Sequence, residues 1–308
     1  MTRKIIIDTD PGIDDAMAIV YAFSDPMIEV LGLTTVFGNV PVTTATRNAC
    51  ALLTHIGRTV PVAQGAARPL VQAPAPHPDF VHGRDGFGGV AIDPPAMEAD
   101  NRHAAAFLID MLKANPGEIT LVPVGPLTNL AIALEREPAI TDLVAEVVVM
   151  GGAVRTRGNI TEHAEANIWQ DPHAAEKVLN APWPMRMVGL DVTERVRCVP
   201  ADFDRLAAAR PQAGGFLRDA GRFYMDFHAK SVGFDGCFMH DPSAIIAVSC
   251  PDLFDTEAIA LSARCEGEEI GATRPTDDGR AAVDVCLDVR SESVRERFLD
   301  IISAGPLS

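Results

Sequence analysis

The 308-residue sequence predicts an α/β fold: a single domain with a mixed, mostly parallel, Rossmann-like sheet flanked by helices. Short runs rich in β-branched residues alternate with stretches of helical periodicity, as βαβ units require. Acidic and amide side chains follow several of these runs, where ligands bind in open α/β sheets. Because no low-complexity tract, internal repeat or long linker divides the chain, we expect residues 1–308 to form one domain.

Five strands and four helices are predicted in alternation along the first two-thirds of the chain. The strands are short apolar runs: Ile5–Ile7, Val30–Val36, Ile119–Val124, Val147–Met150 and Met185–Leu190. Helical periodicity marks segments between them: Thr43–Gly57, Arg102–Ala114, Leu127–Glu137 and Pro172–Asn180. The alternation predicts parallel strand pairing.

Other segments have their own patterns. The segment Ala73–Gly89 is rich in Pro, Gly and His and predicts a long loop, a feature that is often functional in compact domains. Residues 201–235 have a helical pattern. The tail from Ala258 to Val289 predicts strands with a turn at Asp277-Asp278-Gly279, followed by a final helix to Ser303.

The first predicted strand runs into an acidic motif, Asp8-Thr9-Asp10-Pro11-Gly12-Ile13-Asp14-Asp15. Pro11-Gly12 ends the strand, and Asp14 and Asp15 open an apolar helix, where negative charge suits the positive end of the helix dipole. Three carboxylates therefore converge at one strand end, and without nearby Cys or paired His they favour Ca²⁺ or Mg²⁺ over zinc. The simpler alternative is an N-capping Asp followed by a solvated acidic turn.

Two further strands lead into segments that could contribute neutral oxygen atoms. Asn39 closes the second strand beside the acidic motif, although a turn Asn after a Gly is the alternative. Pro123 and Pro126 remove two backbone donors, which leaves a carbonyl such as that of Val124 available to a hard metal. Taken alone, this segment favours a plain strand-to-helix turn.

Glu165-Ala166-Asn167 follows the glycine-rich Met150-Gly151-Gly152 and precedes Asp171-Pro172. In an extended segment, Glu165 and Asn167 share one face and place an acceptor beside an amide. Such a pair can hold a hydroxylated ligand. A solvated loop is the alternative.

Two histidine motifs are ambiguous from the sequence. In His240-Asp241-Pro242, Asp241 could cap the following apolar helix, or its carboxylate could reach a metal while His240 serves as a proton donor. His82 lies in the long loop, which could be a lid or merely surface.

The charge and the distribution of apolar residues exclude some classes of binding partner. A net charge of −16 disfavours nucleic acid and anionic membrane surfaces, and no apolar run reaches the roughly 18 residues needed to span a bilayer. The N-terminus enters a strand at once, with no signal-peptide pattern. Six widely spaced cysteines form no C-x-x-C pair, so we expect reduced, buried thiols in a cytoplasmic protein.

Taken together, six motifs resemble those of the inosine-uridine-preferring nucleoside hydrolase family. In chain order they are DTDPGIDD, TTVFGN, VPVGPLTN, VVVMGG, EANIWQD and MHDPSA. The match runs over nearly the whole chain, and the opening motif together with HDP is the most specific part. The resemblance implies a Ca²⁺-dependent N-ribohydrolase with a mixed α/β sheet that acts on nucleosides and assembles as a homodimer or homotetramer.

The resemblance also implies a metal site and a reaction. Ca²⁺ would be held by Asp10, Asp15, Asp241 and the main-chain oxygen of Val124, and Asp10 would be the general base that activates a metal-bound water. His240 would assist departure of the base as a proton donor.

The same resemblance places the substrate. Asp14, Asn39, Glu165 and Asn167 would bind the ribose hydroxyls. Met150 and Asn159 would line the same pocket, and His82 would contact the base from its loop. We expect the 73–89 loop and the 222–238 region to close over the substrate and exclude water.

Two departures from the family pattern concern the base. Purine-specific members have a Trp just before the HDP aspartate, where this chain has His240. Protozoan broad-specificity members have a Tyr on the preceding helix, and counting back from His240 without gaps reaches His228. Phe227, His228 or Phe234 could stack on a base, or belong to the core. The sequence favours pyrimidine-preferring or broad specificity.

Two other functions fit parts of the sequence. A metal-dependent phosphohydrolase with an Asp nucleophile in Asp8-Thr9-Asp10 would need Lys or Arg to hold phosphate, and the acidic strand end lacks them. A sugar- or nucleoside-binding module would use the same contacts without turnover.

Overall fold

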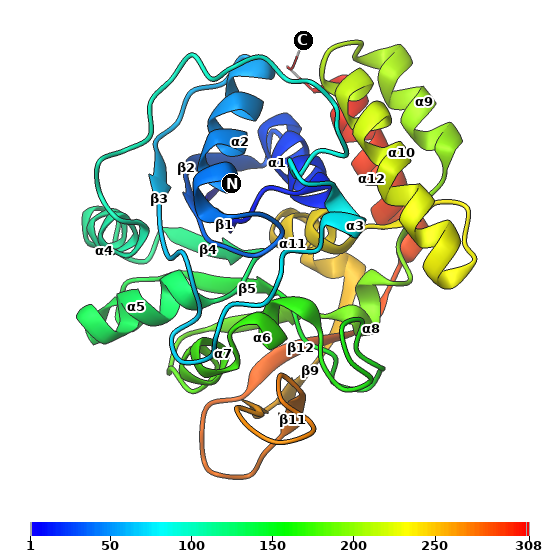
Figure 1. Cartoon of the computed structure of the whole chain (residues 1–308). Helices are drawn as coiled ribbons and strands as arrows, with labels where there is room; N and C mark the ends of the chain where they lie inside the picture. Colours follow the sequence, from blue (N-terminus) through cyan, green and yellow to red (C-terminus); the bar gives the residue numbers. More distant parts are fainter. Residues whose placement is uncertain (1, 306, 308) are drawn as a thin grey trace.

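An eight-stranded sheet in the order β3-β2-β1-β4-β5-β6-β12-β9 runs through the centre of the chain (Figure 1). The computed structural model describes residues 2–305 and 307. The strands are β1 Arg3–Thr9, β2 Ile28–Thr35, β3 Val62–Gln64, β4 Ile119–Pro123, β5 Glu146–Met150, β6 Met185–Val188, β9 Phe254–Ile259 and β12 Val283–Val289. Every neighbouring pair is parallel except β12 with β9, which confirms the predicted mixed, mostly parallel sheet.

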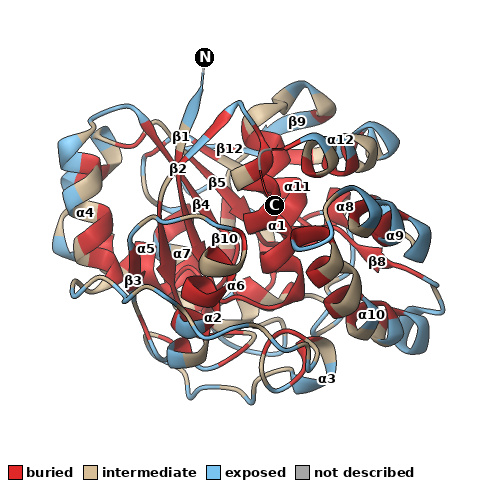
Figure 2. Ribbon diagram, turned by 90° about the horizontal axis from the view of Figure 1, so that it is seen from above, coloured by how far each residue is buried: buried red, intermediate tan, exposed pale blue. Residues whose placement is uncertain are grey.

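Helices cover both faces of this sheet (Figure 2). One face packs against α1 Ile13–Ser24, α2 Val42–His55 and α11 His240–Ser249, and the helices α10 Ala213–Val232 and α12 Ser291–Ala304 pack against α1 in the same core. The other packs against α4 Ala104–Ala114, α5 Thr128–Arg136 and α7 Pro172–Leu179. Because side chains alternate along a strand, Ile5 and Ile7 of β1 enter the first core and Ile6 enters the second.

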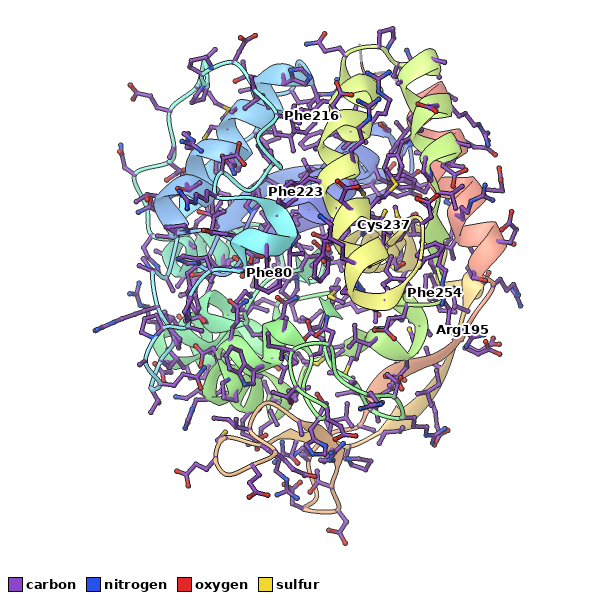
Figure 3. All side chains as sticks on the ribbon, turned by 45° about the vertical axis from the view of Figure 1, so that its right-hand side comes forward. Phe80, Arg195, Phe216, Phe223, Cys237 and Phe254 are labelled. Atoms are coloured by element: carbon purple, nitrogen blue, oxygen red, sulfur yellow. The ribbon has the colours of Figure 1, made fainter. Side chains whose placement is uncertain are left out.

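The connection from β3 to α4 crosses the carboxyl ends of the strands. It contains α3, Asp79–His82, within the segment predicted as a long loop. Phe80 stands on α3 beside α10 (Figure 3), and its ring lies 5.8 Å from that of Phe227. The 222–238 region contains the end of α10, a short turn and the strand β8, Cys237–Phe238.

The sequence located the main elements, but it missed short ones. All five predicted strands and all four predicted helices are present, and residues 201–235 form two helices, α9 Pro200–Ala209 and α10. The strand predicted to reach Leu190 ends at Val188, because Gly189 begins the short helix α8 Leu190–Thr193. The edge strand β3 and α6 Ala166–Gln170 were not predicted, since each is too short to show a period.

The structure also bears on the predictions about the cysteines and about membrane-spanning segments. All six cysteines are free, but Cys250 and Cys265 are only half-buried because they lie at a helix end and in a surface loop. Among the residues described, no helix combines the length and apolar character that crossing a membrane requires. The chain has two further two-stranded sheets, β7 Arg197–Cys198 with β8 Cys237–Phe238 and β10 Leu261–Ala263 with β11 Thr273–Pro275.

Candidate active site

Four aspartates from two helix starts meet at the carboxyl end of β1. The strand ends at Thr9, and the Pro-Gly turn leads into α1, so Asp10 lies in the turn while Asp14 and Asp15 lie in the first helical turn. Asp241 comes from the first turn of α11, which packs against α1. One oxygen each from Asp14, Asp15 and Asp241 lies within 4.8 Å of the others.

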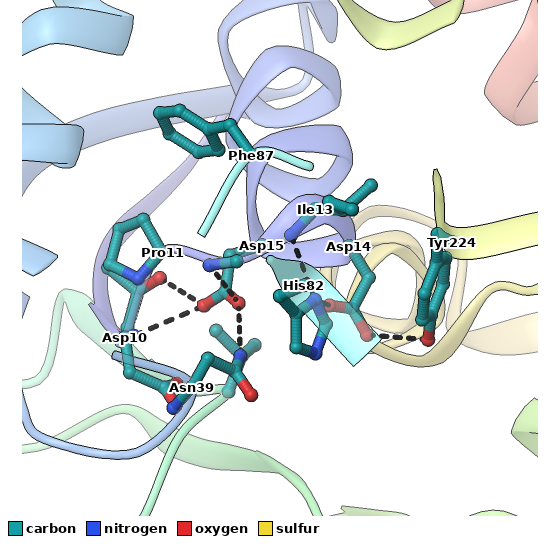
Figure 4. A network of polar contacts seen from close by, with 12 residues as sticks. Asp10, Pro11, Ile13, Asp14, Asp15, Asn39, His82, Phe87 and Tyr224 are labelled. Atoms are coloured by element: carbon teal, nitrogen blue, oxygen red, sulfur yellow. Dashed lines mark hydrogen bonds and ion pairs between the residues drawn. The ribbon is translucent and has the colours of Figure 1, made fainter. Parts of the chain in front are cut away.

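Asp15 shapes the turn that presents these side chains (Figure 4). Its Oδ1 accepts hydrogen bonds from the Thr9 hydroxyl (2.5 Å) and the Asp10 N–H (3.1 Å). Its Oδ2 accepts from the Gly12 N–H (2.9 Å) and from Nδ2 of Asn39 (3.0 Å). The N-cap of α1 is Gly12, and Asp15 caps the helix from its third position. Because Asp14 and Asp15 are both buried, the simpler alternative of an N-capping Asp followed by a solvated acidic turn is wrong. The capping contacts fix the Asp15 carboxylate inside the aspartate cluster.

Asp10 is fixed at one oxygen and unpartnered at the other. Its Oδ2 accepts the Asn39 N–H at 2.6 Å, whereas its buried Oδ1 has no hydrogen-bond partner. Gly38 and Gly125 leave the space that this carboxylate occupies, because a Cβ on either would come within 2.0 Å and 2.4 Å of its oxygens. Any larger residue at these positions would displace Asp10.

The carboxyl groups of the aspartate cluster have raised pKa values, and no basic side chain among the described residues neutralises them. Burial, reinforced by neighbouring carboxylates, raises the pKa of Asp10 and Asp241 well above the usual aspartate value. Burial raises the pKa of Asp14 to about 6 and also raises that of Asp15. The His82 ring lies 3.8 Å from Asp14, but burial lowers its pKa to about 4, so at neutral pH it brings no charge. Among the described residues, no Lys or Arg pairs with the cluster.

The second group of predicted residues surrounds the end of β4 and β5. Asn167 donates from Nδ2 to the Val124 carbonyl (2.9 Å) and to the Met150 carbonyl (3.2 Å). Glu165 caps α6: its carboxylate accepts the N–H groups of Asn167 (2.8 Å) and Ile168 (3.1 Å), and also that of Gly152 (3.0 Å). These contacts hold Glu165 and Asn167 in place, and burial raises the pKa of Glu165.

A cavity of about 610 Å³ opens beside the aspartates, within the range of small-molecule sites. The predicted residues that line it are Asp14, Asn39, His82, Val124, Met150, Asn159, Glu165, Asn167, His240 and Asp241. Asp10 and Asp15 are more deeply buried, at 1% and 0% exposure. The structure therefore brings together all twelve residues that the sequence singled out. No Lys or Arg is among the described residues that line the cavity.

Three histidines form one wall of this cavity, and their partners constrain their tautomers. The Nδ1 atom of His82 accepts the Ile13 N–H at 3.2 Å, so the proton of the neutral ring is on Nε2. His228 donates from Nδ1 to the Tyr224 carbonyl at 2.8 Å, which leaves its Nε2 as an acceptor. Nδ1 of His240 lies 2.8 Å from the Thr193 hydroxyl.

Burial keeps these histidines neutral. It is the main cause that lowers the pKa of His240 to about 3 and lowers that of His228, and neighbouring imidazoles lower the His240 value further. Each ring therefore presents one fixed polar atom at physiological pH.

Two residues at the site, Tyr224 and Thr193, were not predicted from the sequence. The Tyr224 hydroxyl donates to Asp14 at 3.2 Å, and its ring stacks on His82 with centroids 5.4 Å apart. The spacing of Tyr224 and His228, one helical turn apart, was the available signal. Thr193 ends the four-residue helix α8, which follows β6 and is too short to be predicted from periodicity. No motif in the sequence indicates that Thr193 contacts the site.

Comparison with known proteins gives consistent results. The model of the inosine-uridine preferring nucleoside hydrolase family matches residues 5–296. Uridine nucleosidase 1 of Arabidopsis thaliana is 41% identical over 272 residues, covering 88% of this chain and 81% of that protein. The solved structure of a plant nucleoside hydrolase, the PpNRh1 enzyme, superposes with a TM-score of 0.95 at 35% identity, covering 99% of this chain and 100% of that one.

A purine-preferring ribonucleoside hydrolase from Gardnerella vaginalis has a TM-score of 0.94 at 32% identity, covering 98% of both chains. The matches extend over nearly the full chain and include the segments that form the aspartate cluster. The protein is therefore a nucleoside hydrolase, an enzyme that hydrolyses ribonucleosides to ribose and free base, and it belongs to the inosine-uridine preferring nucleoside hydrolase family.

Proposed function

We propose that this enzyme cleaves the N-glycosidic bond of ribonucleosides with the help of Ca²⁺, with Asp10 as general base and His240 assisting departure of the base. One observation carries the proposal: Asp10, Asp14, Asp15 and Asp241 are buried together beside the cavity, without a Lys or Arg partner among the described residues. Such a group is costly to bury unless a cation neutralises it.

The donor set fits a hard cation. Asp10, Asp15, Asp241 and the main-chain oxygen of Val124 would hold the ion, and carboxylate and carbonyl oxygens are the ligands that Ca²⁺ prefers. The unpartnered Oδ1 of Asp10 supports this assignment, because a buried oxygen without a partner is destabilising. When bound, the ion would lower the pKa of a water molecule and orient the ribose diol.

Asp14 belongs to the same cluster but has a different proposed role. Tyr224 donates to its Oδ2, while its Oδ1 has no partner and the residue lines the cavity. We assign Asp14 to a ribose hydroxyl, together with Asn39, Glu165 and Asn167. Hydrogen bonds already fix these side chains in the free protein. Substrate binding would therefore cost little of their conformational entropy.

The chain's own residues supply the rest of the chemistry. Asp10 would take a proton from the attacking water, with one carboxylate oxygen held by the Asn39 N–H and the other free of protein partners. Cleavage builds positive charge on the sugar, as in the transition state of glycosidases. The carboxylates of Asp14 and Glu165 would stabilise that charge from fixed positions.

The histidine wall supports a preference for pyrimidine nucleosides. His82 presents an N–H donor and His228 an acceptor, which complement the carbonyl and N–H groups on the edge of uracil. The relative from Arabidopsis thaliana is named a uridine nucleosidase. The similar purine-preferring structure makes purine nucleosides the necessary comparison.

We expect kcat/KM to be higher for uridine and cytidine than for inosine and adenosine. Methylation of uridine at N3 removes the proton that His228 would accept, so 3-methyluridine should react about tenfold more slowly or worse. In a His228→Phe variant this discrimination should disappear. Steady-state kinetics on the five nucleosides tests both points, and faster cleavage of inosine than of uridine would contradict the preference.

The other two interpretations lose support. The family and its named members are hydrolases of nucleosides, which disfavours a binding module without turnover. A phosphohydrolase would need cations to hold phosphate, and no Lys or Arg lines the cavity among the described residues.

Replacement of His240 with Ala should separate substrates by their leaving group. With uridine, kcat should fall by about 10²- to 10³-fold, the usual cost of removing one hydrogen-bond donor that stabilises the charge developing on the departing base. With 4-nitrophenyl riboside, whose leaving group needs no proton, the loss should be much smaller. His55→Ala, at the end of α2 and outside the cavity lining, is the matched control. Equal losses on both substrates would exclude the assisting role.

A further inference from the structure

Thr193 is placed directly behind His240. It ends α8, is fully buried, and its hydroxyl lies 2.8 Å from Nδ1 of His240. Among the described residues, that hydroxyl has no other hydrogen-bond partner. With Nδ1 engaged by Thr193, Nε2 is the only polar atom of His240 left for a ligand in the cavity.

The backbone around Thr193 is closely held. The Leu190 N–H donates to the Gly152 carbonyl at 2.9 Å, and the Thr193 N–H donates to the Gly189 carbonyl at 3.1 Å. A Cβ on Gly189 would lie 2.6 Å from the Gly152 oxygen, so α8 starts in close contact with the loop after β5. That same loop is bonded to Glu165 through the Gly152 N–H.

His240 is held from the opposite side by its own segment. The Met239 N–H donates to the Val196 carbonyl at 3.0 Å, which joins β8 to the chain just after α8. The Phe238 ring lies 5.8 Å from the His240 ring. The backbone is therefore fixed, but rotation of the imidazole and the choice of its tautomer depend on the Thr193 hydroxyl.

We propose that Thr193 is a positioning residue: it donates a hydrogen bond to Nδ1 of His240, and thereby keeps the ring proton on Nε2, directed to the departing base. The inference rests on the proposed function. The opposite tautomer would place the Nε2 lone pair against a base that is gaining electrons, which is repulsive.

His240 differs in this respect from the other two histidines. Backbone groups of Ile13 and Tyr224 fix the tautomers of His82 and His228, and no side-chain substitution removes them. The tautomer of His240 alone depends on a side-chain hydroxyl, so it can be changed by one nearly isosteric substitution, Thr193→Val.

The test compares Thr193→Val and Thr193→Ser on two substrates. For Thr193→Val we expect kcat on uridine to fall by about 10- to 100-fold, as for other residues that orient an active-site His, with KM little changed. On 4-nitrophenyl riboside the loss should be under about threefold, and Thr193→Ser should restore most of the activity on uridine. Thr273→Val is the matched control, because Thr273 is also fully buried and its hydroxyl has no partner.

Two further measurements distinguish the loss of this hydrogen bond from a general loss of stability. In a double-mutant cycle, Thr193→Val should add little to the loss caused by His240→Ala, since both changes remove one function. In ¹⁵N NMR spectra at fixed pH, the wild-type His240 ring should show a protonated Nε2 and an unprotonated Nδ1, and Thr193→Val should shift this pattern. If Thr193→Val proves too unstable to purify, Thr193→Ala and the wild-type spectrum decide the question.

Different results would contradict the role of Thr193 and the proposed role of His240. Full activity of Thr193→Val beside a large loss in His240→Ala would overturn the role of Thr193 and leave the proposed function intact. Equal losses of Thr193→Val on both substrates, or a wild-type spectrum with the proton on Nδ1, would also overturn it. Equal losses of His240→Ala on both substrates would instead remove the proposed role of His240.

Discussion

Replacement of Asp10 with Asn is expected to lower kcat on uridine by about 10³- to 10⁴-fold, the combined effect of losing a general base and one charge from the site. The amide keeps the shape that Gly38 and Gly125 accommodate, and its oxygen can still accept the Asn39 N–H. Asp10→Ala, which also deletes a proposed ligand, should remove calcium binding along with activity. Steady-state kinetics and calorimetric titration with CaCl₂ measure the two effects.

Asp25→Asn provides a control for the loss of a buried carboxylate. Asp25 caps the other end of α1, opposite the aspartate cluster, and pairs with Arg297 at 2.9 Å. This variant should unfold at a lower temperature but keep the kcat and calcium affinity of the wild type. Asp10→Asn with more than a tenth of wild-type kcat would show that another group is the base.

Calcium binding is expected to release protons, and its affinity is expected to rise between pH 6 and pH 8. The raised pKa values of Asp10 and Asp241, with Asp14 at about 6, mean that the metal-free site holds protons near neutrality. Because Ca²⁺ binds only the ionised carboxylates, each binding event should displace protons from them, fewer as the pH rises. Calorimetry in PIPES and in Tris, which differ in protonation enthalpy, counts them.

The same shifts fix the sign of the effect on stability. A carboxyl whose pKa is raised by folding stabilises the fold fully below its unfolded pKa of about 3.8, and that contribution is lost as the pH rises through the raised value. The metal-free protein should therefore be most stabilised by calcium at the alkaline end of this range. The buried histidines act oppositely below about pH 6.5, so melting temperatures with and without calcium are compared at each pH. A calcium effect independent of pH, with no proton release, would contradict the proposed ligands.

The sequence predicted the sheet and most of the site for one physical reason. Strand ends in a parallel sheet meet at one edge, so Asp10, Asn39, Val124 and Met150 had to converge once their strands were recognised. The resemblance supplied roles for His82, Asn159 and Asp241 that spacing alone left open. The homodimer or homotetramer and the cytoplasmic location stay predictions.

What the sequence could not supply depends on long-range packing. Tyr224 meets Asp14 across 210 residues, and Thr193 meets His240 because a four-residue helix turns back toward β8. Neither contact follows from local periodicity. Local sequence did predict that Asp15 lies at the start of α1, and the structure shows that this side chain both caps the helix and belongs to the aspartate cluster.

The wide separation of Asp10 and Asp241 along the chain has a consequence for biosynthesis. On the ribosome, the tip of β1 emerges well before its partners on α10 and α11, which follow it in the chain. Nascent chains that stop short of α11 would have an incomplete metal site, and contacts this distant in sequence form late in folding. Pulse-labelled intermediates should consequently acquire calcium-dependent protease resistance only once residue 241 has left the exit tunnel.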